Sequence, residues 1–168
     1  KWTMPNWCGN TVTLKGEKSH RQEFVDKNKG FDMWDTSKKN EYNDLSFHAQ
    51  IPCPQKHLTA HNKNTSNQGW YAWCNKNWGT KWDCKESEVT HNPLHTSYYF
   101  DTAWGSPVEW VRKVSIKFPL VEFHITWAEE GGEGGHYMFH GGDCFLDKRM
   151  TEKEWREYQG YDEEEEDE

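Results

Sequence analysis

Several short segments of this chain alternate polar and apolar residues, the pattern of β-strands with one buried face. In residues 10–15, Val12 and Leu14 would face the same side, and in residues 121–127 every second residue is large and apolar. The same pattern predicts further strands at 45–51, 80–86, 97–103, 136–139 and 144–147. The chain is therefore expected to build a sheet from short strands spread along its whole length.

Four segments space their apolar residues as helices do. They cover 19–29, 70–77, a stretch from Ser106 to Pro119, and a segment that starts at Thr151. Ser106 is the expected N-cap of the third helix. The core face of that helix would be formed by Val108, Trp110, Val111 and Val114. The last helix opens with a capping box between Thr151 and Glu154, and Trp155 and Tyr158 would dock it on the body.

The order of these elements predicts an α+β fold, with a mainly antiparallel sheet and helices packed on one face. It contains the βαββαβ order of ferredoxin-like domains. We expect one ferredoxin-like domain over residues 4–160, with polar loop insertions near 31–44 and 55–69. Residues 161–168 are expected to form a disordered acidic tail.

Composition indicates a core that is rich in rings and short of aliphatic residues. The chain has eleven Trp and seven Tyr, and each large ring buries roughly 150–250 Å² when packed. The net charge is −8, and residues 162–168 are all carboxylates, so the rest of the chain is nearly neutral. An acidic chain without a dense Lys/Arg stretch argues against a nucleic-acid partner.

The sequence also bears on compartment and cofactors. The five cysteines are irregularly spaced and form no CxxC, which disfavours a disulfide framework and a zinc knuckle. No apolar run approaches the length of a membrane span, so a cytoplasmic protein with no membrane partner is expected. We expect no cofactor and no enzymatic activity, because the chain lacks the motifs of nucleophilic, phosphate-binding and dinucleotide-binding sites.

Three blocks combine tryptophan with small polar residues: MPNWCGN around Trp7, NWGTKWD around Trp78 and Trp82, and FDTAWGSP around Trp104. Their rings are expected to converge on one core, while the polar neighbours hold the strand ends around it. In this order, with TVTLKG after the first block and VEWVRKVSIKFP after the third, they resemble the YubB-type ferredoxin-like domain family of conjugative plasmids and phages. The resemblance implies a ferredoxin-like fold and a gene carried by a mobile element, among accessory genes that blunt host defences.

The blocks supply the candidate binding residues. In NWGTKWD, the side chains of Trp78, Lys81, Trp82 and Asp83 would bind a ligand, or else the rings are buried and the carboxylate holds backbone amides. Asp101 and Trp104 lie where a strand ends before a helix N-terminus, where a carboxylate is stabilised in either a binding or a capping role. The tail adds Asp162, Glu163, Glu164, Glu165 and Glu166 as an arm for a basic partner.

Two alternatives remain open. Histidines at 124, 136 and 140 would share one sheet face and hold a transition metal, which would favour a metal-dependent enzyme. The aromatic strands SYYFDT and VEFHITW would form a stacking face for nucleic acid. The leading hypothesis is a non-enzymatic accessory protein of a phage or plasmid. It would bind and inhibit a host protein or protein–nucleic-acid complex that belongs to a defence system.

Overall fold

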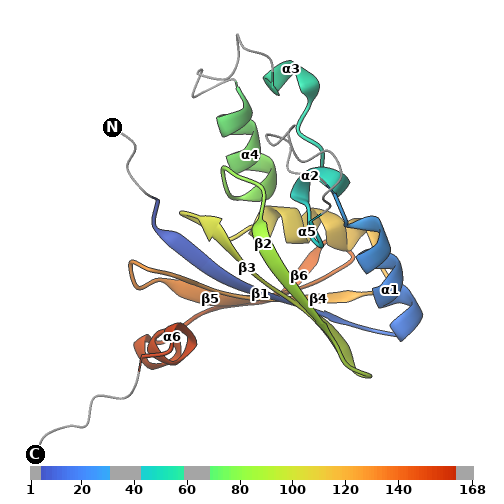
Figure 1. The fold of residues 1–168 in the computed structure, drawn as a ribbon. Helices are drawn as coiled ribbons and strands as arrows, with labels where there is room; N and C mark the ends of the chain where they lie inside the picture. The colour runs from blue at the N-terminus through green and yellow to red at the C-terminus, as the bar shows by residue number, and fades with distance from the viewer. Residues whose placement is uncertain (1–4, 31–42, 59–68, 162–168) are drawn as a thin grey trace, which may run out of the picture.

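The computed structural model describes residues 5–30, 43–58 and 69–161, and its centre is an antiparallel sheet of six strands (Figure 1). The strand order is β2-β3-β1-β4-β5-β6. The strands are β1 (Trp7–Lys15), β2 (Lys85–His91), β3 (His95–Ala103), β4 (Glu122–Glu129), β5 (Gly134–His140) and β6 (Asp143–Arg149). The antiparallel sheet of the expected α+β fold is confirmed.

Six helices accompany the sheet in the described ranges. They are α1 (Lys18–Lys27), α2 (Phe47–Gln50), α3 (Gln55–Leu58), α4 (Trp70–Trp78), α5 (Val108–Lys117) and α6 (Glu152–Gln159). β1, α1, β2, β3, α5 and β4 give the βαββαβ order, with β1 between β3 and β4 in the sheet. α2, α3 and α4 lie between α1 and β2 in the chain, and β5 and β6 extend the sheet beyond β4.

The core lies between the sheet and the layer that contains α1, α4 and α5. Alternate residues of β1, from Cys8 to Leu14, are buried in it, as the period of a half-buried strand requires. The core is rich in rings, as expected. The ring of Phe24 in α1 makes edge contacts, with centroids 5.0–6.3 Å apart, to Tyr98, Trp110, Phe118 and Phe123.

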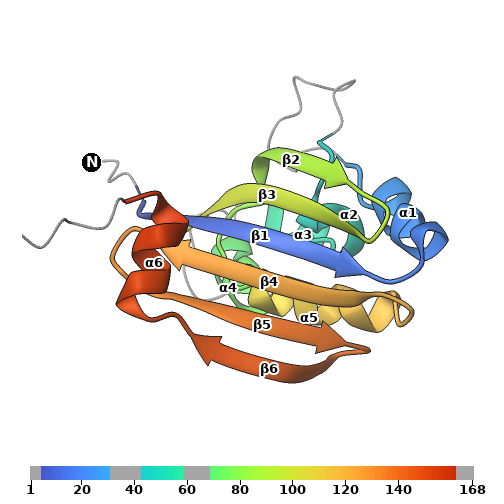
Figure 2. The ribbon, with the colours of Figure 1, turned by 90° about the horizontal axis from the view of Figure 1, so that it is seen from below.

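α6 is the exception to the expected packing, because it lies on the opposite face of the sheet. Figure 2 shows it in front of the strands, with α1, α4 and α5 behind them. The Trp155 indole donates to the carbonyl of Glu129 at 2.8 Å, and the Tyr158 hydroxyl is 2.9 Å from that of Thr11. The expected docking by these two rings and the capping box at Thr151 are both confirmed.

Three local predictions are wrong. Residues 45–51 form no strand: Phe47–Gln50 is the short helix α2, capped by the Ser46 hydroxyl, which accepts from Ala49. Polar–apolar alternation over a few residues does not exclude a single helical turn when such caps are present. The strand expected at 80–86 lies later, at 85–91, because residues 79–84 connect α4 to the sheet. Ser106 does not cap α5, since that helix begins after Pro107 with no side-chain cap.

The expected insertions and tail fall largely on residues 31–42, 59–68 and 162–168, which lie outside the described residues. Within the described part of the second insertion, residues 55–58 form α3. In the described ranges, no helix has both the length and the apolar character that crossing a membrane demands.

Candidate functional site

The face of the sheet that carries α6 contains a groove of about 1140 Å³. Strands β1, β2 and β3 and helix α6 contribute its lining. The lining residues are Trp7, Gly9, Asn10, Thr11, Ser87, Glu88, Tyr99, Phe100, Asp101, Tyr158 and Gln159. Rings and carboxylates therefore occur together in one concave surface, the arrangement expected of a binding site.

Strand register brings the groove residues together. Gly9 pairs with Asp101 and Thr11 pairs with Tyr99, so these four positions face the α6 side while their neighbours enter the core. Gly9 keeps this part of the groove open because it has no side chain. A Cβ at Gly9 would lie 3.5 Å from Cε1 of Tyr158 and 3.7 Å from Oδ1 of Asp101.

Tyr158 forms a fixed wall of the groove. Its hydroxyl is 2.9 Å from the Thr11 hydroxyl and donates to the carbonyl of Thr126 at 3.4 Å. Burial raises the pKa of Tyr158, with a smaller contribution in the same direction from Asp101. The phenol is therefore neutral at physiological pH and acts as an aromatic surface rather than as a base.

One end of the groove is an aromatic cluster. The ring of Trp7, which lines the groove, lies 6.4 Å from the ring of Trp82. The Lys81 ammonium lies 4.0 Å from the centroid of the Trp82 ring, a cation–π contact. The amide of Trp7 donates to the Glu130 carboxylate at 3.1 Å, which fixes the start of β1 beside this cluster.

Trp104 stands at the same end of the sheet in a strained conformation. Its φ is 67°, and the Gly105 amide donates to the Ala103 carbonyl at 2.9 Å across it, which makes Trp104 the centre of a positive-φ γ-turn. That turn is rare and strained for a residue with a Cβ. Among the tryptophans that the structure describes, Trp104 is the exposed one, at 52%.

The three tryptophan blocks meet through their polar residues, but the prediction that their rings converge on one core is wrong, because Trp78 is buried in the core whereas Trp104 is exposed. The Asn10 amide, from the first block, donates to the carbonyl of Phe100 and to the hydroxyl of Thr102 in the third. The second block meets the third at Gly79, where a Cβ would lie 2.8 Å from the backbone oxygen of Ser106. Asn10 and Gly79 therefore hold the ends of strands and helices together.

Trp78 and Asp83 belong to the scaffold. Trp78 is fully buried and donates to the carbonyl of Ile51 at 2.9 Å. Asp83 is also buried, and its carboxylate accepts from the amides of Phe47 and His48 at the start of α2. Both residues lie among the helices. The structure thus separates them from Lys81, Trp82, Asp101 and Trp104.

The three histidines of the metal alternative have different partners. His124 contacts Glu122, Nδ1 of His136 is 3.0 Å from the Thr126 hydroxyl, and Nε2 of His140 is 2.7 Å from the Pro119 carbonyl. Within residues 5–30, 43–58 and 69–161, no group of three His, Cys, Asp or Glu side chains is placed to hold a metal ion.

The strands of the nucleic-acid alternative turn most of their rings inward. Tyr98, Phe100 and Phe123 are buried in the core, and Tyr99 is the ring of SYYFDT that faces outward, 43% exposed. Glu88 and Tyr158 were not among the residues expected at a site, and Tyr99 was expected there only as part of SYYFDT in the nucleic-acid alternative. Alternation along 97–103 signals the outward position of Tyr99, whereas the approach of α6 leaves no local trace in the sequence.

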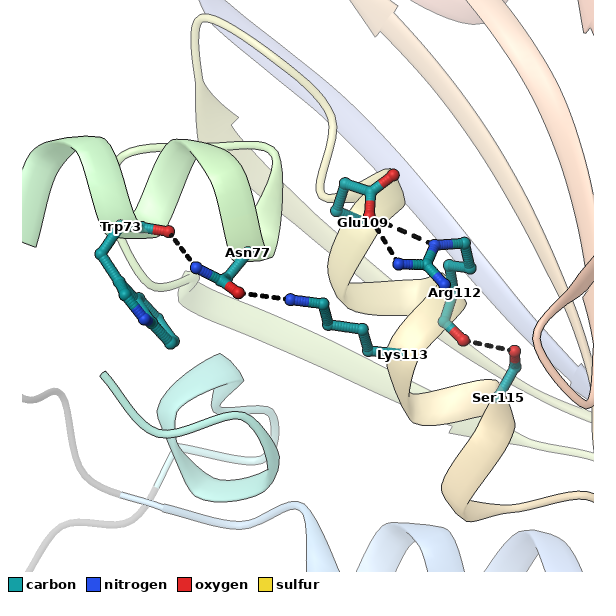
Figure 3. Close-up of polar contacts among 6 residues, drawn as sticks. All are labelled: Trp73, Asn77, Glu109, Arg112, Lys113 and Ser115. Carbon is teal, nitrogen blue, oxygen red and sulfur yellow. Dashed lines mark hydrogen bonds and ion pairs between the residues drawn. The ribbon is translucent and has the colours of Figure 1, made fainter. Parts of the chain in front are cut away.

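A second polar cluster joins α4 to α5 on the helical side. Figure 3 shows Lys113 of α5 reaching Asn77 of α4, where the ammonium donates to Oδ1 at 2.5 Å. Burial lowers the pKa of Lys113. Arg112 is paired with Glu109 at 3.1 Å on the same helix. The Lys113–Asn77 contact holds the two helices together, and the groove remains the candidate site.

Comparison with known proteins gives a family and a fold. Residues 77–168 match the family model described as the ferredoxin-like domain in Api92-like protein. The crystal structure of a protein api92 from Yersinia pseudotuberculosis superposes with a TM-score of 0.64 at 10% identity, covering 88% of this chain and 98% of that one. This likeness supports the ferredoxin-like fold expected from the sequence. No curated protein matches the chain.

Proposed function

Because the chain belongs to the family of the ferredoxin-like domain in Api92-like protein, we propose that it is a non-enzymatic binding protein that docks a host protein in the groove beside α6. On this proposal its gene is carried by a phage or plasmid, as the resemblance to the YubB-type family implies. The bound protein is a component of a host defence system, and docking inhibits that component by occupying its surface.

The observation that carries the proposal is the composition of the groove. Trp7, Tyr99 and Tyr158 line it together with the carboxylates of Glu88 and Asp101. Aromatic residues are the side chains that most often supply binding energy at protein interfaces, and carboxylates at the rim set orientation and association rate. A fixed phenol at Tyr158 suits adhesion better than proton transfer.

Trp104 adds a second line of support. A strained backbone at an exposed tryptophan costs stability, about 1–3 kcal/mol for such a conformation, and strain of this kind clusters at ligand-contacting sites. Trp104 follows Ala103, the register partner of Trp7, at the aromatic end of the groove. We infer that its ring extends the docking surface past the end of β3.

The acidic run 162–168 would strengthen the same contact. It is joined to the chain just after α6, whose Tyr158 and Gln159 line the groove. Seven carboxylates tethered there would raise the association rate of a basic partner, and this gain would fade as salt shortens the range of the charges.

The test uses the full-length chain as bait in a bacterial lysate, with mass spectrometry of the captured proteins. Gly9→Val narrows the groove without changing charge, because a Cβ there already lies 3.5 Å from Cε1 of Tyr158 and the valine methyl groups extend beyond it. Asp143→Asn, exposed at the far end of the sheet, is the matched control. A protein captured by the wild type and by the control but not by Gly9→Val supports the proposal. Identical capture by all three baits excludes the groove as the contact.

Inhibition is tested separately with the captured protein in its own assay. The proposal requires a fall in activity on addition of the wild-type chain and a smaller fall with Gly9→Val. A gel shift with single-stranded RNA and DNA covers the nucleic-acid alternative, and a Tyr99-dependent shift would favour that alternative instead.

A further inference from the structure

We propose that the groove recognises arginine or lysine side chains on an extended segment of the docked protein. This inference rests on the proposed function and specifies the chemistry of the partner at the same site. Among the described side chains that line the groove, the charged ones are Glu88 and Asp101, both exposed carboxylates on neighbouring strands. A cationic group is the complement of this lining.

The rings of the groove favour the same ligand. A guanidinium or ammonium group is attracted to the faces of Trp and Tyr, and gains more when a carboxylate accepts its protons as well. Trp7, Tyr99 and Tyr158 supply the rings around Asp101. Arginine suits this mixture better than lysine does, because its planar group stacks on rings and bonds a carboxylate through two donors.

The protein already holds one cation in this way. Lys81 places its ammonium 4.0 Å from the ring centroid of Trp82, and Trp82 lies beside Trp7 at the end of the groove. The aromatic cluster therefore accepts an ammonium group from its own chain. A cation from a partner would find the same kind of surface along the groove.

The dimensions indicate a segment rather than a small molecule. At about 1140 Å³ the groove exceeds the roughly 300–1000 Å³ of ordinary small-molecule pockets. Its lining runs over three neighbouring strands and α6, so it has room for several side chains of an extended peptide. The open shape also suits a flexible segment that orders on binding.

The acidic run 162–168 complicates any test with a basic peptide, because it would attract one by itself. The test therefore uses the full-length chain in which Asp162→Asn and Glu163→Gln, Glu164→Gln, Glu165→Gln and Glu166→Gln remove most of that charge. A fluorescent oligo-arginine peptide is titrated with this chain at low salt, and anisotropy reports binding. Oligo-lysine and oligo-glutamate peptides of equal length are the comparison probes.

The groove is then perturbed in the same background. We expect the double change Glu88→Gln with Asp101→Asn to weaken oligo-arginine binding about tenfold, the size expected for losing two partly exposed carboxylates. Gly9→Val should also weaken binding, although it alters no charge. Asp143→Asn should change affinity less than about twofold. Oligo-arginine should bind more tightly than oligo-lysine, and oligo-glutamate should not bind.

The outcomes separate the two proposals. Binding that disappears when the tail is neutralised, or that ignores both groove variants, overturns the inference and assigns peptide binding to the tail. If Gly9→Val abolishes capture of a host protein but oligo-arginine does not bind, the inference is overturned and the proposed function stays in place. Groove-dependent peptide binding without capture of any host protein supports cation recognition and counts against the proposed function.

Discussion

Replacing the buried carboxylate of Asp83 should destabilise the fold without touching the groove. Oδ1 of Asp83 accepts from the amides of Phe47 at 2.6 Å and Cys84 at 2.8 Å. Oδ2 accepts from the amide of His48 at 3.0 Å and the hydroxyl of Ser46 at 3.2 Å. One side chain thus joins the start of α2 to the segment that leads into β2.

The size of the effect follows from the donors left without an acceptor. In Asp83→Asn, the more favourable of the two side-chain orientations leaves the amide oxygen accepting from the amides of Phe47 and Cys84. The NH₂ group then faces the His48 amide and the Ser46 hydroxyl. The Ser46 hydroxyl can turn to accept from NH₂, but the His48 amide loses its partner, at about 1–3 kcal/mol. The two retained hydrogen bonds weaken by about 1 kcal/mol each, because their acceptor is no longer charged. The folded protein also no longer carries the desolvation cost of a buried charge, which offsets part of this loss.

We therefore expect Asp83→Asn to lower the free energy of unfolding by about 2–3 kcal/mol, and Asp83→Ala, which orphans every donor, by about 4 kcal/mol. Urea denaturation followed by circular dichroism measures both, with m-values to check that the transition stays two-state. Asp101→Asn is the matched control, because that carboxylate is exposed, and it should shift stability by less than about 0.5 kcal/mol. A change below about 0.5 kcal/mol in Asp83→Asn would refute the capping role.

Three further predictions concern a buried tyrosine, the cysteines and a glycine with positive φ. The Tyr98 hydroxyl is buried with no hydrogen-bond partner among the described residues, and burial raises the pKa of Tyr98 above its ordinary value. Because the unfolded chain ionises this phenol at a lower pH than the folded protein does, the stability of the fold is independent of Tyr98 ionisation below about pH 10 and falls as the pH rises further. Tyr98→Phe should raise the melting temperature at pH 8 and reduce the loss of stability above pH 10. Iodoacetamide at pH 8 should modify Cys144, the exposed cysteine, in the native protein. It should spare Cys8, because burial raises the pKa of that thiol to about 12. Mass spectrometry of native Cys144→Ser should therefore show no labelling. Gly79→Ala should cost more than about 2 kcal/mol in urea denaturation, because Gly79 has φ of 87° and a Cβ would press on the Ser106 carbonyl; a change under about 0.5 kcal/mol would contradict this.

The sheet could be predicted from the sequence because its signals are local. Alternation in 10–15, 97–103 and 121–127 marks β1 and the two strands that flank it, and the capping box at Thr151 marks α6. The prediction failed where a long-range contact decides the outcome. Residues 45–51 alternate like a strand, yet Asp83, 36 positions from Phe47, stabilises a helical turn there.

The candidate site was only partly predictable for the same reason. Asp101 lies in the groove, and Lys81, Trp82 and Trp104 lie at or near its aromatic end, so four of the residues expected from composition belong to the candidate groove or its surroundings. The wall formed by Tyr158 and the floor left open by Gly9 depend on where α6 crosses the sheet. Helix packing of that kind depends on contacts 147 residues apart, such as Thr11 with Tyr158, which no local pattern encodes.

The motif blocks contain the same residue types in two opposite environments, one buried among the helices and one exposed at the surface. Trp78 and Asp83 are buried among helices, where their polar atoms are already bonded to backbone groups. Trp104 and Asp101 are exposed, Asp101 lines the groove, and the backbone of Trp104 is strained rather than relaxed. If both pairs served only stability, the exposed pair would contribute little to it and the strain would persist without an offsetting contact. A partner that covers the groove would supply that contact, so Asp101 should matter for binding and Asp83 for folding.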